Sequence, residues 1–107
     1  MSRPARSPFE VRESAIHGLG VFATRRIRRD AWLGAYEGPR TEENGTYVLW
    51  VEFDDGEVVG IDGQNELRYL NHSRTPNACF AGVELFALRE IPRGAEITID
   101  YGEDWAE

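Results

Sequence analysis

Apolar and polar side chains alternate in short runs along this 107-residue chain, and no run shows the helical period over the roughly 11 residues of an ordinary helix. Alternation with period two is the mark of a strand that buries one face. It predicts a strand over residues 9–14, and two further short runs, 31–36 and 84–88, are also predicted to be strands. Two β-branched and aromatic runs, 47–53 and 57–61, flank a turn at Asp54-Asp55-Gly56 and predict a hairpin. The pattern therefore indicates a mostly β protein of short strands.

The connections between these runs are short. Two glycines flank one residue in Gly18-Leu19-Gly20, which predicts a turn whose backbone can be approached closely. Residues 25–30 form a basic connector that we expect to be solvated, 64–70 a short helical turn, and 91–94 a turn. Residues 1–8 are rich in arginine and proline and predict a flexible arm, so residues 9–107 form the single domain.

One segment, Arg68 to Asn77, is polar where a small domain should be apolar. Asn71, His72, Ser73 and Asn77 place four hydrogen-bonding side chains within seven residues, between apolar neighbours that suggest burial. Buried amides and imidazoles need partners. The run from Glu96 to Gly102 is the best candidate, and we predict that the two segments meet.

The charge is unevenly distributed. All twelve cationic residues are arginines, and the formal net charge is −7. Residues 1–40 hold eight arginines and four acids, whereas residues 41–107 hold four arginines and fifteen acids. An acidic body argues against nucleic acid as the main ligand and fits a basic protein or peptide substrate. Solubility alone would explain the acidity equally well.

Cysteine usage and hydropathy limit the cellular compartments in which the protein is expected. Cys79 is the only cysteine, which excludes an intramolecular disulfide and a zinc site built on several thiolates. No apolar run approaches the roughly 18 residues of a membrane span, and residues 1–7 lack the apolar region of a signal peptide. We expect a soluble, cytoplasmic protein without a membrane partner.

Hydrolytic and zinc chemistry do not fit the residues present. His72 and Ser73 are adjacent, and neighbours in an extended chain point to opposite faces, so adjacency does not make them a nucleophile and base. The two histidines, His17 and His72, are too few for a three-ligand catalytic zinc site without further carboxylates. We expect no metal.

Three motifs together resemble those of the SET-domain protein lysine methyltransferases. They are Gly18-Leu19-Gly20-Val21-Phe22-Ala23, then Asn71-His72-Ser73 with Pro76-Asn77, then Glu96 to Gly102 with its Asp100-Tyr101-Gly102 end. The resemblance covers residues 9–105, and its second and third motifs are specific. The compact length is most similar to the minimal SET proteins of large viruses and bacteria.

The resemblance implies a SET-domain fold of small curved sheets with a threaded, pseudoknot-like C-terminal segment. That segment would pass beneath the loop carrying Asn71 and His72, an arrangement that ordinary domains avoid. The implied cofactor is S-adenosylmethionine. By the same resemblance, the backbone of Gly18, Leu19 and Gly20 receives its methionine end, Arg68, Asn71 and His72 add contacts, and Trp105 covers the adenine.

For the reaction, the resemblance implies a catalytic Tyr101 and a lysine channel walled by Tyr36. Phe80 and Ile99 fall where family members control the number of methyl groups, because a hydroxyl there holds a water that a bulkier amine must displace. Neither residue carries a hydroxyl. The resemblance therefore predicts more than one methyl per lysine on a basic substrate such as a histone-like or ribosomal protein.

Two departures from the family pattern leave alternatives open. Arg74 stands where many relatives have cysteine, and the insert between Gly38 and Arg68 is little more than the predicted hairpin. A short substrate groove could be completed by a homodimer, or the chain could be a non-catalytic SET-like module that grips a basic peptide. A small all-β interaction protein with a fortuitous match is a third reading.

Overall fold

The structure is a computed structural model that describes residues 7–101. Its strands are β1 (Phe9–Glu13), β2 (Leu19–Ala23), β3 (Trp32–Ala35), β4 (Arg40–Thr41), β5 (Val48–Glu52), β6 (Val58–Asp62), β7 (Asn71–His72), β8 (Ala78–Ala81), β9 (Glu84–Ala87) and β10 (Glu96–Ile99). One short 3₁₀ helix, η1 (Glu66–Tyr69), precedes β7. The mostly β architecture is confirmed. In the described part of the chain, no helix is long and apolar enough to cross a membrane.

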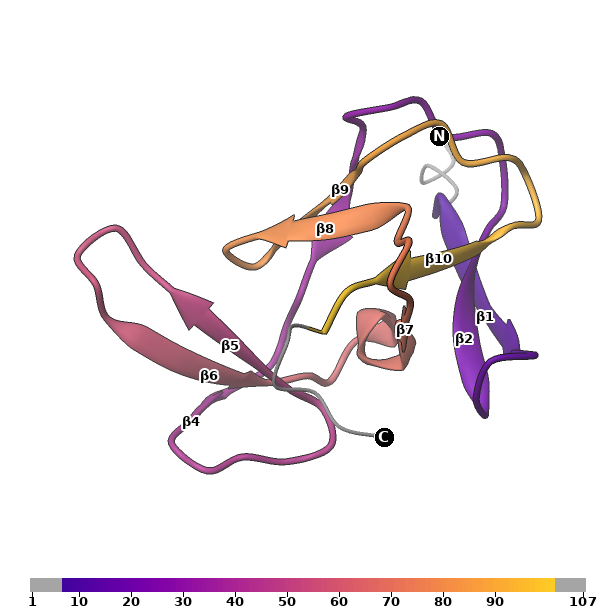
Figure 1. The fold of residues 1–107 in the computed structure, drawn as a ribbon. Coiled ribbons are helices and arrows are strands. Elements are labelled where there is room, and N and C mark those ends of the chain that lie inside the picture. Colours follow the sequence, from indigo (N-terminus) through magenta and orange to yellow (C-terminus); the bar gives the residue numbers. More distant parts are fainter. Residues whose placement is uncertain (1–6, 102–107) are drawn as a thin grey trace, which may run out of the picture.

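The strands form three small sheets, which Figure 1 shows arranged around β10 and η1. A four-stranded sheet has the order β1-β2-β10-β7, and two three-stranded sheets have the orders β3-β9-β8 and β4-β6-β5. The predicted hairpin is confirmed as β5 and β6, which pair from Val48↔Asp62 to Glu52↔Val58. Figure 1 shows that this hairpin projects away from the other two sheets.

Some elements were not evident in the sequence. β8 pairs with β9 in a hairpin turned by Gly82, whose φ is +63°, although the residue pattern predicts no strand at β8. The basic connector 25–30 is not wholly solvated, because Ile27 is buried and forms an antiparallel bridge with Ile91. A single apolar residue among arginines thus anchors the connector to the 91–94 turn.

Strand β10 is the crossing point of the fold. It pairs antiparallel with β2 through Glu96↔Phe22 and Ile97↔Val21, and parallel with β7 through Thr98↔Asn71 and Ile99↔His72. Figure 1 shows this yellow strand between two segments that are far apart in sequence. The prediction that the polar segment meets the run beginning at Glu96 is confirmed, because β10 is inserted between β2 and β7.

The Asn77 side chain closes the loop over β10. Its Nδ2 donates to the Glu96 carbonyl at 2.8 Å, and its Oδ1 accepts the Thr98 N–H at 2.9 Å. The Ser73 N–H adds a backbone bond to the Ile99 carbonyl at 2.9 Å. Because buried backbone groups must be paired, one carboxamide replaces the strand that β10 lacks at this point.

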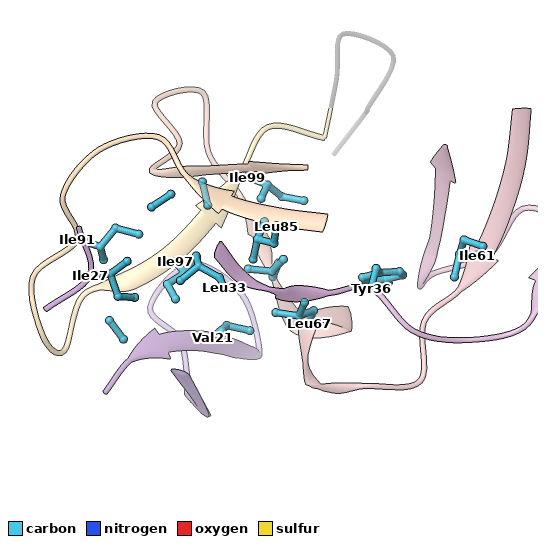
Figure 2. Packing of buried hydrophobic residues seen from close by; sticks show 14 of the residues in the cluster. Val21, Ile27, Leu33, Tyr36, Ile61, Leu67, Leu85, Ile91, Ile97 and Ile99 are labelled. Carbon is cyan, nitrogen blue, oxygen red and sulfur yellow. The ribbon is translucent and has the colours of Figure 1, made fainter. Parts of the chain in front are cut away.

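The core gathers around the apolar side chains of β10. Val21, Leu67, Leu85, Ile91 and Ile97 are all at most 1% exposed. Figure 2 shows these residues grouped between the sheets, whereas Tyr36 and Ile61 lie apart from them toward the β4-β6-β5 sheet. The domain therefore has one main core with an extension beneath the hairpin.

Replacing Asn77 by alanine should destabilise the domain strongly. The Glu96 carbonyl and the Thr98 N–H would both lose their partner, which costs about 2–3 kcal/mol of unfolding free energy. Urea denaturation measures this loss. Asn44→Ala is the matched control, because Asn44 is exposed and only accepts a hydrogen bond from the Trp50 indole at 3.2 Å. Equal stability of the Asn77 and Asn44 variants would contradict the role given to Asn77.

Candidate active site

The Asn71 side chain is the hub of the site. It is 7% exposed, and its Nδ2 lies within hydrogen-bond distance of four oxygens. These are Ser14 Oγ, the His17 carbonyl and the Leu19 carbonyl, each at 3.1 Å, and Glu96 Oε2 at 2.8 Å. A carboxamide has two N–H groups, so these contacts are shared among the acceptors. Asn71 therefore ties β7 to β10 and to residues 14–19, which we call the glycine-rich loop.

The two glycines of the first motif serve different needs. Gly18 ends the loop with φ +42°, and a Cβ added there would meet no atom within 4 Å. Gly20 lies inside β2, where a Cβ would lie 2.3 Å from Glu96 Oε2. Gly18 thus leaves open space beside its backbone, whereas a side chain at Gly20 would collide with the Glu96 carboxylate. Their predicted roles toward a cofactor stay predictions.

His72 and Tyr101 form the second part of the site. The Tyr101 N–H donates to His72 Nδ1 at 2.9 Å, and the two ring centroids are 5.2 Å apart. An Nδ1 that accepts this hydrogen bond places the proton of the neutral ring on Nε2. The Asp100 carboxylate lies 3.7 Å from the same Nδ1, too far for a hydrogen bond. His72 thus fixes the backbone from which Tyr101 projects.

The Tyr101 hydroxyl points back into the protein. It donates a hydrogen bond to the Leu70 carbonyl, next to Asn71 in the chain. Burial of the hydroxyl, and more weakly the charge of Glu96, raises the pKa of Tyr101 above its ordinary value. The residue is 41% exposed as a whole. Tyr101 therefore presents a neutral hydroxyl at a partly open position.

Tyr36 lies on the other side of the site, beneath the hairpin. Its hydroxyl donates to the Tyr47 carbonyl at 2.6 Å, and its ring meets Phe80 edge-on at 5.6 Å. A Cβ at Gly63 would lie 2.3 Å from the Tyr36 hydroxyl, so only glycine admits the ring there. Tyr36 and Phe80, both predicted channel residues, are thus brought together in one aromatic wall.

The surroundings of Tyr36 suppress its ionisation. Burial first, and then the ionised form of Tyr101 and the Asp62 carboxylate, raise the pKa of Tyr36 to about 12. Arg68 acts in the opposite direction. The Tyr36 side chain therefore stays uncharged at neutral pH.

The remaining predicted site residues have other positions. Arg68 donates to the Gln64 and Asn65 carbonyls at 2.8 and 2.9 Å and stacks on the Tyr69 ring at 4.3 Å, so its guanidinium lies against the chain that leads into η1. Ile99 is 8% exposed and belongs to the core. Their roles toward cofactor and substrate stay predictions. Trp105 lies outside the described residues, as do residues 1–6 of the predicted arm.

Two polar residues of the site were not found from the sequence, namely Ser14 and Glu96. Ser14 ends the first predicted strand, and nothing in its neighbours distinguishes it from any other serine. Glu96 carries a signal, because it is charged at the head of a strand whose other residues are buried. A carboxylate in such a strand needs polar partners. Across residues 7–101, no group of three or more His, Cys, Asp or Glu side chains could hold a metal ion.

The fold is one of small sheets around an inserted C-terminal strand. The methyltransferase domain of human histone-lysine N-methyltransferase SETMAR has this fold. The two structures match with a TM-score of 0.76 over 90% of this chain and 45% of that chain, at 21% sequence identity. At that identity the likeness is one of fold.

The chain belongs to the SET-domain family, because the profile of the SET domain matches residues 18–102. Histone-lysine N-methyltransferase MEDEA of Arabidopsis thaliana is 31% identical over 110 residues, and human histone-lysine N-methyltransferase 2B is 32% identical over 123 residues. These matches cover 83% and 94% of this chain but only 16% and 4% of those proteins.

A shorter relative is matched over most of its length. The H3 lysine-37 specific histone-lysine N-methyltransferase of Schizosaccharomyces pombe is 27% identical over 121 residues. That match covers 95% of this chain and 79% of that protein. The family assignment of the sequence analysis is thus confirmed, whereas the narrower resemblance to viral and bacterial members stays a prediction, as does a cytoplasmic location.

The buried hydroxyl of Tyr36 should make the domain less stable at high pH. An unfolded tyrosine ionises near pH 10, whereas Tyr36 in the folded state keeps its proton to about pH 12. The native state then binds more protons, so the free energy of unfolding falls as pH rises through this window. Tyr36→Phe should flatten the fall, measured by urea denaturation at a series of pH values. An equal flattening by Tyr47→Phe, at an exposed tyrosine, would contradict this assignment.

Proposed function

We propose that this domain is a protein-lysine N-methyltransferase that transfers the methyl group of S-adenosylmethionine to a lysine of a basic protein. The observation that carries the proposal is the meeting of three motifs at β7. Asn71 binds the carbonyls of the glycine-rich loop, and His72 beside it binds the backbone of Tyr101. The relatives that are histone-lysine methyltransferases support the same activity.

The proposed transfer is a direct displacement. The lone pair of a neutral lysine nitrogen forms the new N–C bond, the S–CH₃ bond breaks, and its electron pair stays on sulfur as S-adenosylhomocysteine. The product ammonium then loses a proton to water. Because the leaving group is neutral, the protein has to hold and align the reactants rather than protonate a leaving group.

The neutral amine is the costly reactant. Free lysine has a pKa of about 10.4, so the neutral form costs about 4–5 kcal/mol at pH 7. A channel walled by Tyr36 and Phe80 would lower that cost, because an apolar environment beside a cationic sulfonium disfavours the ammonium. In this role Tyr36 lines the channel and the Tyr101 hydroxyl orients the nitrogen. Gly18, Leu19, Asn71 and His72 would hold the cofactor, with Arg68 and Trp105 as further contacts.

The substrate side of the proposal rests on charge. Residues 41–67 contain eight acids and no cation, and they include the whole β5–β6 hairpin. This surface favours a basic segment such as a histone-like tail. The same observation supports the second candidate function, a SET-like module that binds a basic peptide without methylating it. A homodimer that completes the short groove stays part of either proposal.

Tyr101→Phe separates the two candidate functions. It should lower the methyl-transfer rate at saturating substrate by about 100-fold, because the nitrogen loses its alignment. The dissociation constant of S-adenosylmethionine should change by less than about threefold. Single-turnover transfer to a lysine-rich histone measures the first quantity, and isothermal titration calorimetry measures the second.

Tyr47→Phe is the control for that experiment, since it removes the hydroxyl of a nearby exposed tyrosine. The Tyr101 variant also loses the bond to the Leu70 carbonyl, worth about 1 kcal/mol, so both variants are compared at a temperature where they are folded. A folded wild-type protein that binds the peptide but neither binds the cofactor nor transfers methyl would establish the binding module instead.

Phe80→Tyr should reduce the number of methyl groups added per lysine. The new hydroxyl would lie in the aromatic wall beside Tyr36 and retain a water that a methylated amine has to displace. Mass spectrometry of a methylated peptide should show mainly monomethyl product for the variant and higher products for the wild type. Phe53→Tyr, on the exposed end of the hairpin, should leave the distribution unchanged. Identical product distributions for all three proteins would contradict the placement of Phe80 in the channel.

A further inference from the structure

Glu96 is a carboxylate at the start of a strand whose other side chains are buried. Its two oxygens each accept one hydrogen bond, Oε1 from Ser14 Oγ at 2.7 Å and Oε2 from Asn71 Nδ2 at 2.8 Å. Ser14 Oγ and Asn71 Nδ2 are themselves 3.1 Å apart. Three side chains from distant parts of the sequence thus form a closed triangle of hydrogen bonds.

This triangle holds the glycine-rich loop by several bonds. Ser14 Oγ accepts the Ile16 N–H at 3.0 Å, and the Ser14 N–H donates to the Gly18 carbonyl at 2.8 Å. Asn71 binds the carbonyls of His17 and Leu19. The side-chain hydrogen bonds to the loop backbone between Ile16 and Leu19 therefore come from Ser14 or Asn71, and both of those side chains bind Glu96.

The chemistry of a carboxylate determines how the loop is held. A carboxylate only accepts hydrogen bonds. It therefore takes the hydroxyl hydrogen of Ser14, which leaves the Ser14 oxygen free to accept the Ile16 N–H. It also accepts from Asn71 Nδ2, so the nitrogen of that amide, and not its oxygen, faces the loop carbonyls. A glutamine of the same shape would present one NH₂ group to this triangle and reverse the direction of one bond.

The backbone opposite Glu96 is shaped to admit the carboxylate. A Cβ at Gly20 would lie 2.3 Å from Glu96 Oε2 and 3.0 Å from Ser14 Cβ. The second glycine of the first motif therefore makes room for Glu96, while Gly18 faces open space. The pairing of Glu96 with Phe22 holds the Glu96 backbone beside β2, close to Gly20.

We propose that Glu96 is a positioning residue for the cofactor. Through Ser14 and Asn71 it fixes the backbone of residues 14–19 in the conformation that receives S-adenosylmethionine. This inference rests on the proposed function. It adds a residue that shapes the cofactor site through Ser14 and Asn71 and does not itself touch the ligand. Glu96 sets how well the cofactor binds, whereas Tyr101 sets how fast the methyl group moves.

The first experiment compares Glu96→Gln with the wild type in cofactor binding and steady-state kinetics. The dissociation constant and the KM for S-adenosylmethionine should rise about tenfold, as expected for a weakened hydrogen bond to a charged group. The kcat at saturating cofactor should stay within about twofold. Glu10→Gln makes the same chemical change on exposed β1 and should alter neither constant.

A second variant tests whether the triangle acts as a unit. Ser14→Ala alone should weaken cofactor binding, and the double variant Ser14→Ala with Glu96→Gln should bind about as weakly as Glu96→Gln alone. Amide hydrogen exchange without cofactor gives an independent readout. The Ile16 and Ser14 amides should exchange at least about fivefold faster in the Glu96 variant than in the wild type.

The outcomes distinguish this proposal from the proposed function. Suppose that the wild type binds the cofactor, that Glu96→Gln and Ser14→Ala bind it as tightly as the wild type, and that amide hydrogen exchange is unchanged. The role of Glu96 is then overturned and the proposed function stands. A fall in the kcat of Glu96→Gln with an unchanged KM for S-adenosylmethionine would also overturn the role of Glu96. If the wild type itself does not bind S-adenosylmethionine, the proposed function fails and this proposal fails with it.

Discussion

The pairing of β10 on both of its edges is the constraint on which the rest of the structure depends. An inserted strand must find partners for every buried N–H and C=O group, because an unpaired group in the core costs as much as a lost hydrogen bond. β2 supplies one edge, and β7 with the Asn77 carboxamide supplies the other. The polar segment that looks misplaced in a small core is therefore the means by which this core is closed.

The same crossing brings the chemistry together. The short stretch of β7 contributes Asn71 to the glycine-rich loop on one side and His72 to the Tyr101 backbone on the other. Side chains that are hydrogen-bonded to two separate segments have little freedom to move, and this favours precise alignment of reactants. The aromatic wall is built separately, from Tyr36 directly after β3 and Phe80 in β8, and depends on Gly63 for its space.

Much of this arrangement follows from local sequence pattern, and the rest depends on contacts that no local pattern reveals. The hairpin of β5 and β6 was predictable because strand-forming runs flank a turn of suitable residues. The meeting of Asn71 with β10 was predictable because buried polar groups need partners. β8 was missed since its small residues, beginning Ala78-Cys79, carry little strand preference, and Ile27 was hidden among arginines. Ser14 acquires its role only through contacts with residues more than 50 positions away.

The place of β10 in the sequence also bears on how the chain reaches its native state. The strand is near the C-terminal end, yet its antiparallel partner Phe22 lies 74 positions earlier than Glu96. During synthesis, β1 and β2 leave the ribosome long before the segment that joins them to β7. Folding then requires closure of a long loop before the central sheet exists, which is slow and exposes apolar edges. The domain is expected to fold late and all at once, after the last strand has emerged.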